Sequence, residues 1–237
     1  MTDFAAFQSI VELRRYTLHP GRRDELIELF EREFVETQEA TGMHLFGQFR
    51  EPAEPDKFVW LRGFRDMAAR KAALESFYFG PVWREHGPAA NETMIDASDV
   101  LLLRPSGPGF PAPDAPRPSI GDTPDSPDSR VLVTVCHPAG PVKDFAEFFA
   151  DTVDPVLRES DVDTFGRFET EPAENTFSRL PVRENETVFV WFAKFADADA
   201  LAAHRELLDR AGAELAGRLE RPWRQLELAP TPRSLLR

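Results

Sequence analysis

Apolar and polar side chains alternate along residues 10–17, and the same alternation returns along residues 58–64. In the first stretch Val11 and Leu13 share one side, whereas Glu12, Arg14 and Tyr16 share the other. A period of two residues predicts β-strands. Residues 43–50 and 100–104 fit the same pattern, so we expect four strands in the first part of the chain.

Between these strands, apolar residues recur at helical spacing. Residues 22–40 carry an apolar stripe that predicts one continuous helix; the stripe contains Leu26, Ile27, Phe30 and Phe34. Asp66 is a suitable N-cap for a second helix, which Gly80-Pro81 interrupts before a further helical piece over residues 82–94. The resulting order, βαββαβ, is typical of a ferredoxin-like unit.

The chain contains this unit twice. Phe46-Gly-Gln-Phe49 returns as Phe165-Gly-Arg-Phe168, 119 positions later, and Val59-Trp60 returns as Val190-Trp191, 131 positions later. The change in offset predicts an insertion in the second copy, over residues 176–186. A period this long indicates a duplicated domain.

Three segments follow from the repeat: a ferredoxin-like unit over residues 1–104, a linker over residues 105–130, and a second, diverged unit over residues 131–237. The linker holds eight prolines, which predicts an extended, semi-rigid tether, and the tail after Pro230 is expected to be loose. Each unit leaves one sheet face bare, and a bare face needs a partner. We therefore predict an α+β protein whose two ferredoxin-like units form an intrachain dimeric α/β-barrel.

Composition restricts the classes of partner. The formal net charge of −13 disfavours nucleic acid, and no apolar run is long enough to span a membrane. Met1 to Ser9 lacks the features of a signal peptide, so a cytoplasmic location is expected. Cys136 is the only cysteine, and no histidines are paired at ligand spacing, so we expect no metal site.

Several spaced motifs resemble the NIPSNAP family of the dimeric α/β-barrel superfamily. They are Val11-Glu-Leu-Arg-Arg-Tyr16 with His19-Pro-Gly21, Phe58-Val-Trp-Leu-Arg-Gly-Phe64, Phe77-Tyr-Phe-Gly-Pro-Val-Trp83 and Ala90-Asn-Glu-Thr-Met94. The resemblance implies two ferredoxin-like halves closing into a barrel. It transfers no catalytic machinery, because the superfamily includes cofactor-free monooxygenases, haem proteins and plain binding proteins.

The two copies differ in their polar residues, and this difference is the main functional clue. On the faces that we assign to the barrel interior, the first copy carries charged and hydrogen-bonding side chains where the second is more apolar. A concave space with a few convergent polar groups is typical of a small-molecule pocket. We expect such a pocket to be lined by Arg14, Tyr16, His44, Trp60 and Arg62, with Tyr78, Trp83 and His86 near its mouth.

The function predicted from these residues is binding of a small apolar or aromatic metabolite in the barrel, without a cofactor. Whether the chain is an enzyme stays open; the enzymatic version is a cofactor-independent oxygenase or isomerase with His44 as base and Arg62 stabilising negative charge. By superfamily analogy His44 could instead ligate haem. Glu12 could equally pair with Arg14 or Arg62 for structure alone. The alternative function is a non-enzymatic scaffold that assembles, for example as a homo-oligomer, through sheet edges or helix faces.

Overall fold

The computed structural model describes residues 4–122, 125–159 and 162–237. Its first half follows the predicted order. The strands are β1 (Ile10–Leu18), β2 (His44–Arg50), β3 (Lys57–Phe64) and β4 (Met94–Pro105), and the helices are α1 (Arg23–Leu29), α2 (Val35–Glu39), α3 (Met67–Tyr78) and α4 (Pro81–Glu92). A short 3-10 helix, Phe4–Gln8, precedes β1.

Local sequence explains the helix boundaries in this half. The Asp66 carboxylate accepts a hydrogen bond from the Ala69 amide at 2.7 Å, so Asp66 caps α3 as expected. The prediction of one continuous helix over residues 22–40 is wrong in one respect, because a π-helical turn, Phe30–Phe34, separates α1 from α2. The wider turn leaves both Phe30 and Phe34 buried.

The second half repeats the order of elements. Its strands are β5 (Arg130–Cys136), β6 (Asp163–Thr170), β7 (Phe189–Phe195) and β8 (Arg224–Pro230), and its helices are α5 (Val142–Phe148), α6 (Asp154–Glu159) and α7 (Ala198–Ala216). A second π-helical turn, Phe149–Val153, lies between α5 and α6. No helix in the described segments is long and apolar enough to cross a membrane.

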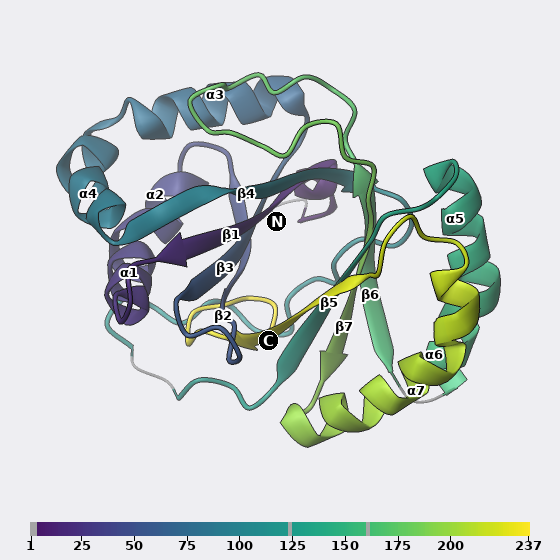
Figure 1. The fold of residues 1–237 in the computed structure, drawn as a ribbon. Helices are drawn as coiled ribbons and strands as arrows, with labels where there is room; N and C mark the ends of the chain where they lie inside the picture. The colour runs from purple at the N-terminus through teal and green to yellow at the C-terminus, as the bar shows by residue number, and fades with distance from the viewer. Residues whose placement is uncertain (1–3, 123–124, 160–161) are drawn as a thin grey trace.

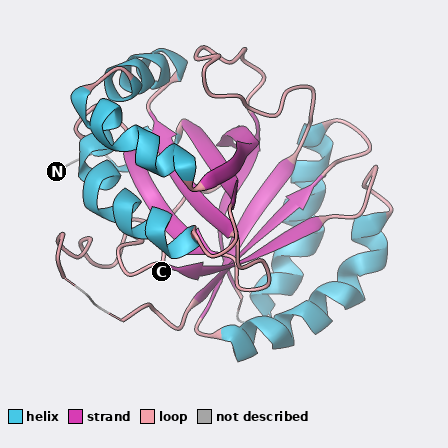
Figure 2. Ribbon diagram, turned by 60° about the vertical axis from the view of Figure 1, so that its left-hand side comes forward, coloured by secondary structure: helices cyan, strands magenta, loops and turns pink. Residues whose placement is uncertain are grey.

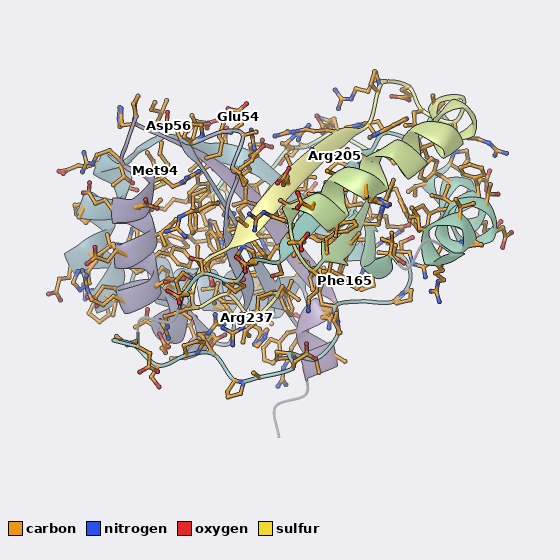
Figure 3. The ribbon with its side chains drawn as sticks, turned by 90° about the horizontal axis from the view of Figure 1, so that it is seen from below. Glu54, Asp56, Met94, Phe165, Arg205 and Arg237 are labelled. Carbon is orange, nitrogen blue, oxygen red and sulfur yellow. The ribbon has the colours of Figure 1, made fainter. Side chains whose placement is uncertain are left out.

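The eight strands close into one antiparallel barrel in the order β1-β3-β2-β8-β5-β7-β6-β4. Helices α1 to α4 cover the outside of the first half and α5 to α7 cover the outside of the second, so two helical layers flank the barrel (Figures 1 and 2). In Figure 3, Met94 lies on the side of the first helical layer, and Arg205 lies on α7 of the second.

The barrel interior is an apolar core to which both halves contribute. Val11 and Leu13 of β1 share one cluster with Val131 and Val133 of β5 and with the Phe192 ring of β7. Branched and aromatic side chains from all eight strands fill this space. Among the described residues the barrel interior is therefore a packed core.

The proline-rich segment and the tail take part in this core. Phe110 is buried against Phe46, Phe165, Phe168 and Phe192. The Gln8 side chain holds the Phe110 backbone, donating to its carbonyl at 2.9 Å and accepting from its amide at 2.5 Å.

At the end of the chain, the Leu236 amide bonds to the Phe46 carbonyl at 2.9 Å, and the Leu236 side chain is buried in the same cluster. The prediction of a loose tail is wrong, because the barrel buries Leu236, and the proline-rich segment adds Phe110 to the core besides joining the two halves.

Candidate functional site

The polar face of β1 and β3 lies under the helices of the first half. Glu12 pairs in register with Arg62, and Arg14 pairs with Trp60. Trp60 and Tyr16 belong to the cluster formed with α1 to α4, whereas their neighbours Val11 and Leu13 belong to the barrel core. The prediction that these polar residues face the barrel interior is therefore wrong.

The physical reason is that both faces of the sheet are buried. The interior around Val11 and Leu13 is mainly apolar, so Glu12, Arg14 and Arg62 lie on the helical side, where hydrogen-bonding groups are available.

Glu12 lies at the centre of a buried charge cluster. Its carboxylate meets Arg14 Nη1 at 2.7 Å, Arg62 Nε at 2.8 Å and Arg70 Nε at 2.6 Å. All four side chains have no exposed surface. Glu12 thus pairs with Arg14 and Arg62, as the structural interpretation of the sequence allowed, but it does so outside the barrel and with a third arginine from α3.

Each arginine also contacts a neutral polar group. Arg14 Nε donates to the Tyr16 hydroxyl at 2.9 Å, and Arg62 Nη1 donates to Gln38 Oε1 at 2.9 Å and lies 3.5 Å from the Tyr78 hydroxyl. Because the Tyr16 oxygen accepts from Arg14, its own O–H remains able to donate to another group.

Charge and burial set the protonation states. Burial alone would raise the pKa of Glu12, but the guanidiniums of Arg62, Arg14 and Arg70 outweigh it and hold that pKa well below its usual range. Burial also raises the pKa of Tyr16, although the neighbouring Arg14 opposes the shift. At neutral pH the cluster therefore contains a carboxylate, three guanidiniums and a neutral phenol.

A cavity of about 80 Å³ lies between this sheet face and the helices. Tyr16 and Trp60 line it from the strands, Gln38 from α2, and Trp83 from α4. A larger surface groove of about 560 Å³ shares Tyr78, Trp83 and Asn91 with it. The common lining residues place the groove next to the cavity.

The guanidiniums of Arg14 and Arg62 lie behind the aromatic side chains that line the cavity. The Arg14 guanidinium carbon is 5.5 Å from the Trp60 ring centroid, and that of Arg62 is 4.9 Å from the same ring and 5.8 Å from the Tyr78 ring. The cavity therefore has an apolar surface with positive charge close beneath it.

The structure brings most of the predicted pocket residues together. Tyr16, Trp60, Tyr78 and Trp83 line the cavity, and Arg14 and Arg62 back its wall.

The two histidines lie elsewhere. His44 is not among the lining residues; its ring contacts the rings of Phe7 and Phe46, and burial lowers its pKa. His86 on α4 is partly exposed, 3.5 Å from a Glu33 oxygen. His44 Nδ1 lies 3.6 Å from a Glu39 oxygen, and the side chain is partly exposed.

Sequence reasoning missed three contributors. Arg70 precedes Leu74 by four positions and Phe77 by seven, so helical periodicity places it on the buried stripe of α3. Gln38 lies four positions after Phe34 on the same basis, and both signals were present in the sequence.

The third contributor is Leu180, which lines the cavity from the insertion in the second half. We call residues 172–187 the strap. It lies beside α3 at the top of Figure 1. No local pattern indicates that contact.

The strap closes over the first half through several contacts. Its Asn175 accepts from Arg70 at 3.0 Å, and its Phe177 ring is 5.9 Å from the Tyr78 ring. The Arg183 amide bonds to the Val100 carbonyl at 2.8 Å. The second half thus supplies part of the cover of a site built on the first half.

Comparison with solved structures identifies the architecture. The chain is similar to a proposed monooxygenase from Fusobacterium nucleatum, with a TM-score of 0.59 at 12% identity over 93% of this chain and 91% of that one. A proposed monooxygenase from Lactobacillus acidophilus gives 0.59 at 14% identity, over 93% of each chain. An anthrone oxidase-like protein gives 0.57 at 14% identity, over 94% of this chain and 92% of that one. These likenesses show a common fold.

Sequence comparison identifies the first half. No curated protein matches the chain, but residues 11–107 match the family model named NIPSNAP. That span contains β1 to β4, Glu12 and all three of its arginine partners. The first half of the barrel is therefore a NIPSNAP domain.

Proposed function

We propose that the chain binds a small apolar or aromatic molecule in the cavity between β1, β3 and the helices of the first half. The observation that carries the proposal is the cavity of about 80 Å³ with a groove of about 560 Å³ beside it, the two sharing Tyr78, Trp83 and Asn91. The inner part holds one ring or a short chain, and the groove accommodates the rest. Concave, mostly apolar spaces with a few polar groups are typical ligand sites.

The lining supports an aromatic ligand. Trp60, Trp83 and Tyr16 offer faces and edges for ring stacking. The Tyr16 hydroxyl accepts from Arg14 and keeps its proton for a ligand oxygen. Recognition would therefore combine ring contacts with one directed hydrogen bond.

Ligand binding is the function that the cavity supports best, and catalysis on the bound ligand is an extension of it. The structural relatives named as monooxygenases or anthrone oxidase-like favour a cofactor-free oxygenase in which Tyr16 and Arg62 stabilise an oxyanion. The general base of that scheme would have to come from elsewhere, because the lining residues include no histidine or carboxylate. His44, the base candidate from the sequence, is not among these lining residues.

A duplication accounts for the shape of the whole chain. Strand orders β4-β1-β3-β2 and β8-β5-β7-β6 are equivalent. The two π-helical turns begin at Phe30 and Phe149, 119 positions apart, and the register shifts between Leu45 and Gly47 in β2 and between Phe165 and Arg167 in β6, within one position of the same offset. Shared irregularities support two ferredoxin-like copies more strongly than shared regular elements do, since π-turns are rare.

The alternative is a non-enzymatic scaffold, which the filled barrel and the exposed Phe79 and Ile95 favour. Light scattering coupled to size exclusion tests it, because assembly through these residues predicts an oligomer that Phe79→Ser weakens. A cytoplasmic location fits either function and stays a prediction.

Ligand binding can be tested with a panel of one- and two-ring aromatic compounds, half acids and half primary amides. Binding should raise the melting temperature and quench the fluorescence of Trp60 and Trp83. Ala90 lines the cavity, whereas Ala89 is exposed on the same helix. Ala90→Leu should abolish binding and Ala89→Leu should preserve it.

Two results would overturn the proposal. One is that no compound of the panel binds the wild-type chain. The other is that the well-folded Ala90→Leu variant binds as tightly as Ala89→Leu.

A further inference from the structure

The charges behind the cavity do not balance. Glu12 carries one negative charge, and Arg14, Arg62 and Arg70 carry three positive charges, all fully buried. In the described part of the chain, no other carboxylate lies within 4.0 Å of these guanidiniums. The cluster therefore holds two positive charges in excess.

The remaining contacts of the arginines are neutral. Tyr16 and Gln38 contact Arg14 and Arg62, and the strap offers Arg70 only the side-chain oxygens of Asn175 and Thr176. Among the described residues, Arg14 Nη2 and Arg70 Nη2 have no hydrogen-bond partner, and Arg62 Nη2 has only its ion pair with Glu12 at 2.8 Å. Buried charges are normally compensated and their donors satisfied.

Packing of the fold does not require these arginines. In the second half, Thr134 of β5 takes the place of Arg14, because it pairs with Trp191 as Arg14 pairs with Trp60, and Ala193 of β7 takes the place of Arg62. Thr134 and Ala193 are both fully buried, and their neighbours Leu132 and Trp191 belong to the apolar layer under α5 to α7. The same junction of sheet and helices is thus stable without charge, so the excess in the first half calls for another explanation.

We propose that the ligand of the first-half cavity is an organic anion, an apolar or aromatic body with a carboxylate-type group, and that its charge is compensated by the Glu12 arginine cluster. The inference rests on the proposed function and specifies its ligand class. The apolar body occupies the cavity and groove. The anionic group meets the Tyr16 and Tyr78 hydroxyls, behind which the guanidiniums of Arg14 and Arg62 lie.

The charges next to the cavity decide whether it prefers an anion or a cation. The whole chain carries −13 and repels anions at long range, but that repulsion between exposed charges is screened by salt, whereas buried charges are screened much less. A buried surplus can therefore select an anion despite the acidic surface. Preference for an anion over its neutral isostere should persist at 0.5 M salt.

The test compares each aryl carboxylate with its own primary amide, for example 1-naphthoate with 1-naphthamide, at pH 7.5. The pair shares shape and ring system and differs in charge. The wild-type chain should bind the carboxylate at least tenfold more tightly than the amide. Arg14→Met should lower carboxylate affinity about tenfold and leave amide affinity unchanged, whereas Arg32→Met, at an exposed arginine, should change neither.

The outcomes separate this inference from the proposed function. If amides bind as tightly as carboxylates, and in a manner that Ala90→Leu blocks, the anion inference is overturned and the cavity proposal stands. If neither class binds, both are overturned. The wild-type chain alone distinguishes carboxylates from amides, so the inference can be tested even if Arg14→Met fails to fold. In that case Arg14→Lys, which keeps the charge, should retain the preference for the carboxylate.

Discussion

Replacing Glu12 with glutamine tests the charge cluster directly. The substitution keeps the shape of the side chain but leaves three guanidiniums without their shared carboxylate, which they meet at 2.6 to 2.8 Å. Arg14, Arg62 and Arg70 would then keep only neutral contacts. We expect Glu12→Gln to be strongly destabilising.

The magnitude follows from the number of ion pairs. At an effective dielectric constant of about 20, each pair contributes roughly 4 kcal/mol of attraction, so about 12 kcal/mol is lost. Relief of the carboxylate desolvation penalty offsets several kcal/mol of this loss. The net decrease in unfolding free energy should be about 5 kcal/mol, which for a chain of this length lowers the melting temperature by roughly 10–20 °C.

Urea denaturation followed by circular dichroism measures this quantity. Glu28→Gln is the matched control, because Glu28 is 77% exposed and pairs only with Arg32 across one helical turn; its cost should be below about 0.5 kcal/mol. Arg14→Met is a useful comparison. It removes one of the three ion pairs of Glu12 but also the repulsion between Arg14 and the other two guanidiniums, so it should cost less stability than Glu12→Gln.

Acid pH provides a second test of the same cluster. The pKa of Glu12 is depressed in the folded state, so its contribution is complete above the unfolded pKa of about 4.5 and is lost as pH falls toward the folded value. The gap between wild type and Glu12→Gln should therefore shrink below about pH 4.5. A decrease of less than 1 kcal/mol at pH 7, or a gap that stays constant down to pH 3, would refute this account of the cluster.

Other elements give simpler predictions. Phe110→Ala empties the end of the barrel and should cost about 3–5 kcal/mol, whereas Ile120→Ala in the same segment, 52% exposed, should cost little; equal costs would contradict a packed Phe110. Burial raises the pKa of the Cys136 thiol, so a thiol reagent at pH 8 should label it only after denaturation. Burial lowers the pKa of His204 to about 4, so stability should fall as pH drops from 6.5 toward 4. His204→Phe should remove that part of the pH dependence in urea titrations, and an unchanged profile would count against it.

Sequence periodicity predicted the elements because it reports local burial. Alternation along residues 10–17 separated Val11 and Leu13 from Arg14 and Tyr16 correctly. It could not say which set faces the barrel, since both faces of this sheet are buried. The polar residues of β1 and β3 suggested a hollow interior. Because buried charges need partners, these side chains lie instead on the face that the helices cover.

The site was predicted in part for the same reason. Strand residues such as Trp60 share the cavity because neighbouring strands hold them in register. Arg70 and Gln38 were recoverable from helical spacing. Leu180 was not, because its contact joins the strap to the opposite half of the barrel, and no local pattern reports such a distant contact.

The strap belongs to one half and covers a site on the other, and this affects how the sequence can evolve. When two identical subunits form a barrel, each substitution appears at both sites, so neither site can be altered alone. Here both halves lie on one polypeptide, and a mutation touches a single site. The first half can therefore keep the charged cavity while the second half evolves to cover and support it. Neither half is expected to bind ligand when expressed by itself.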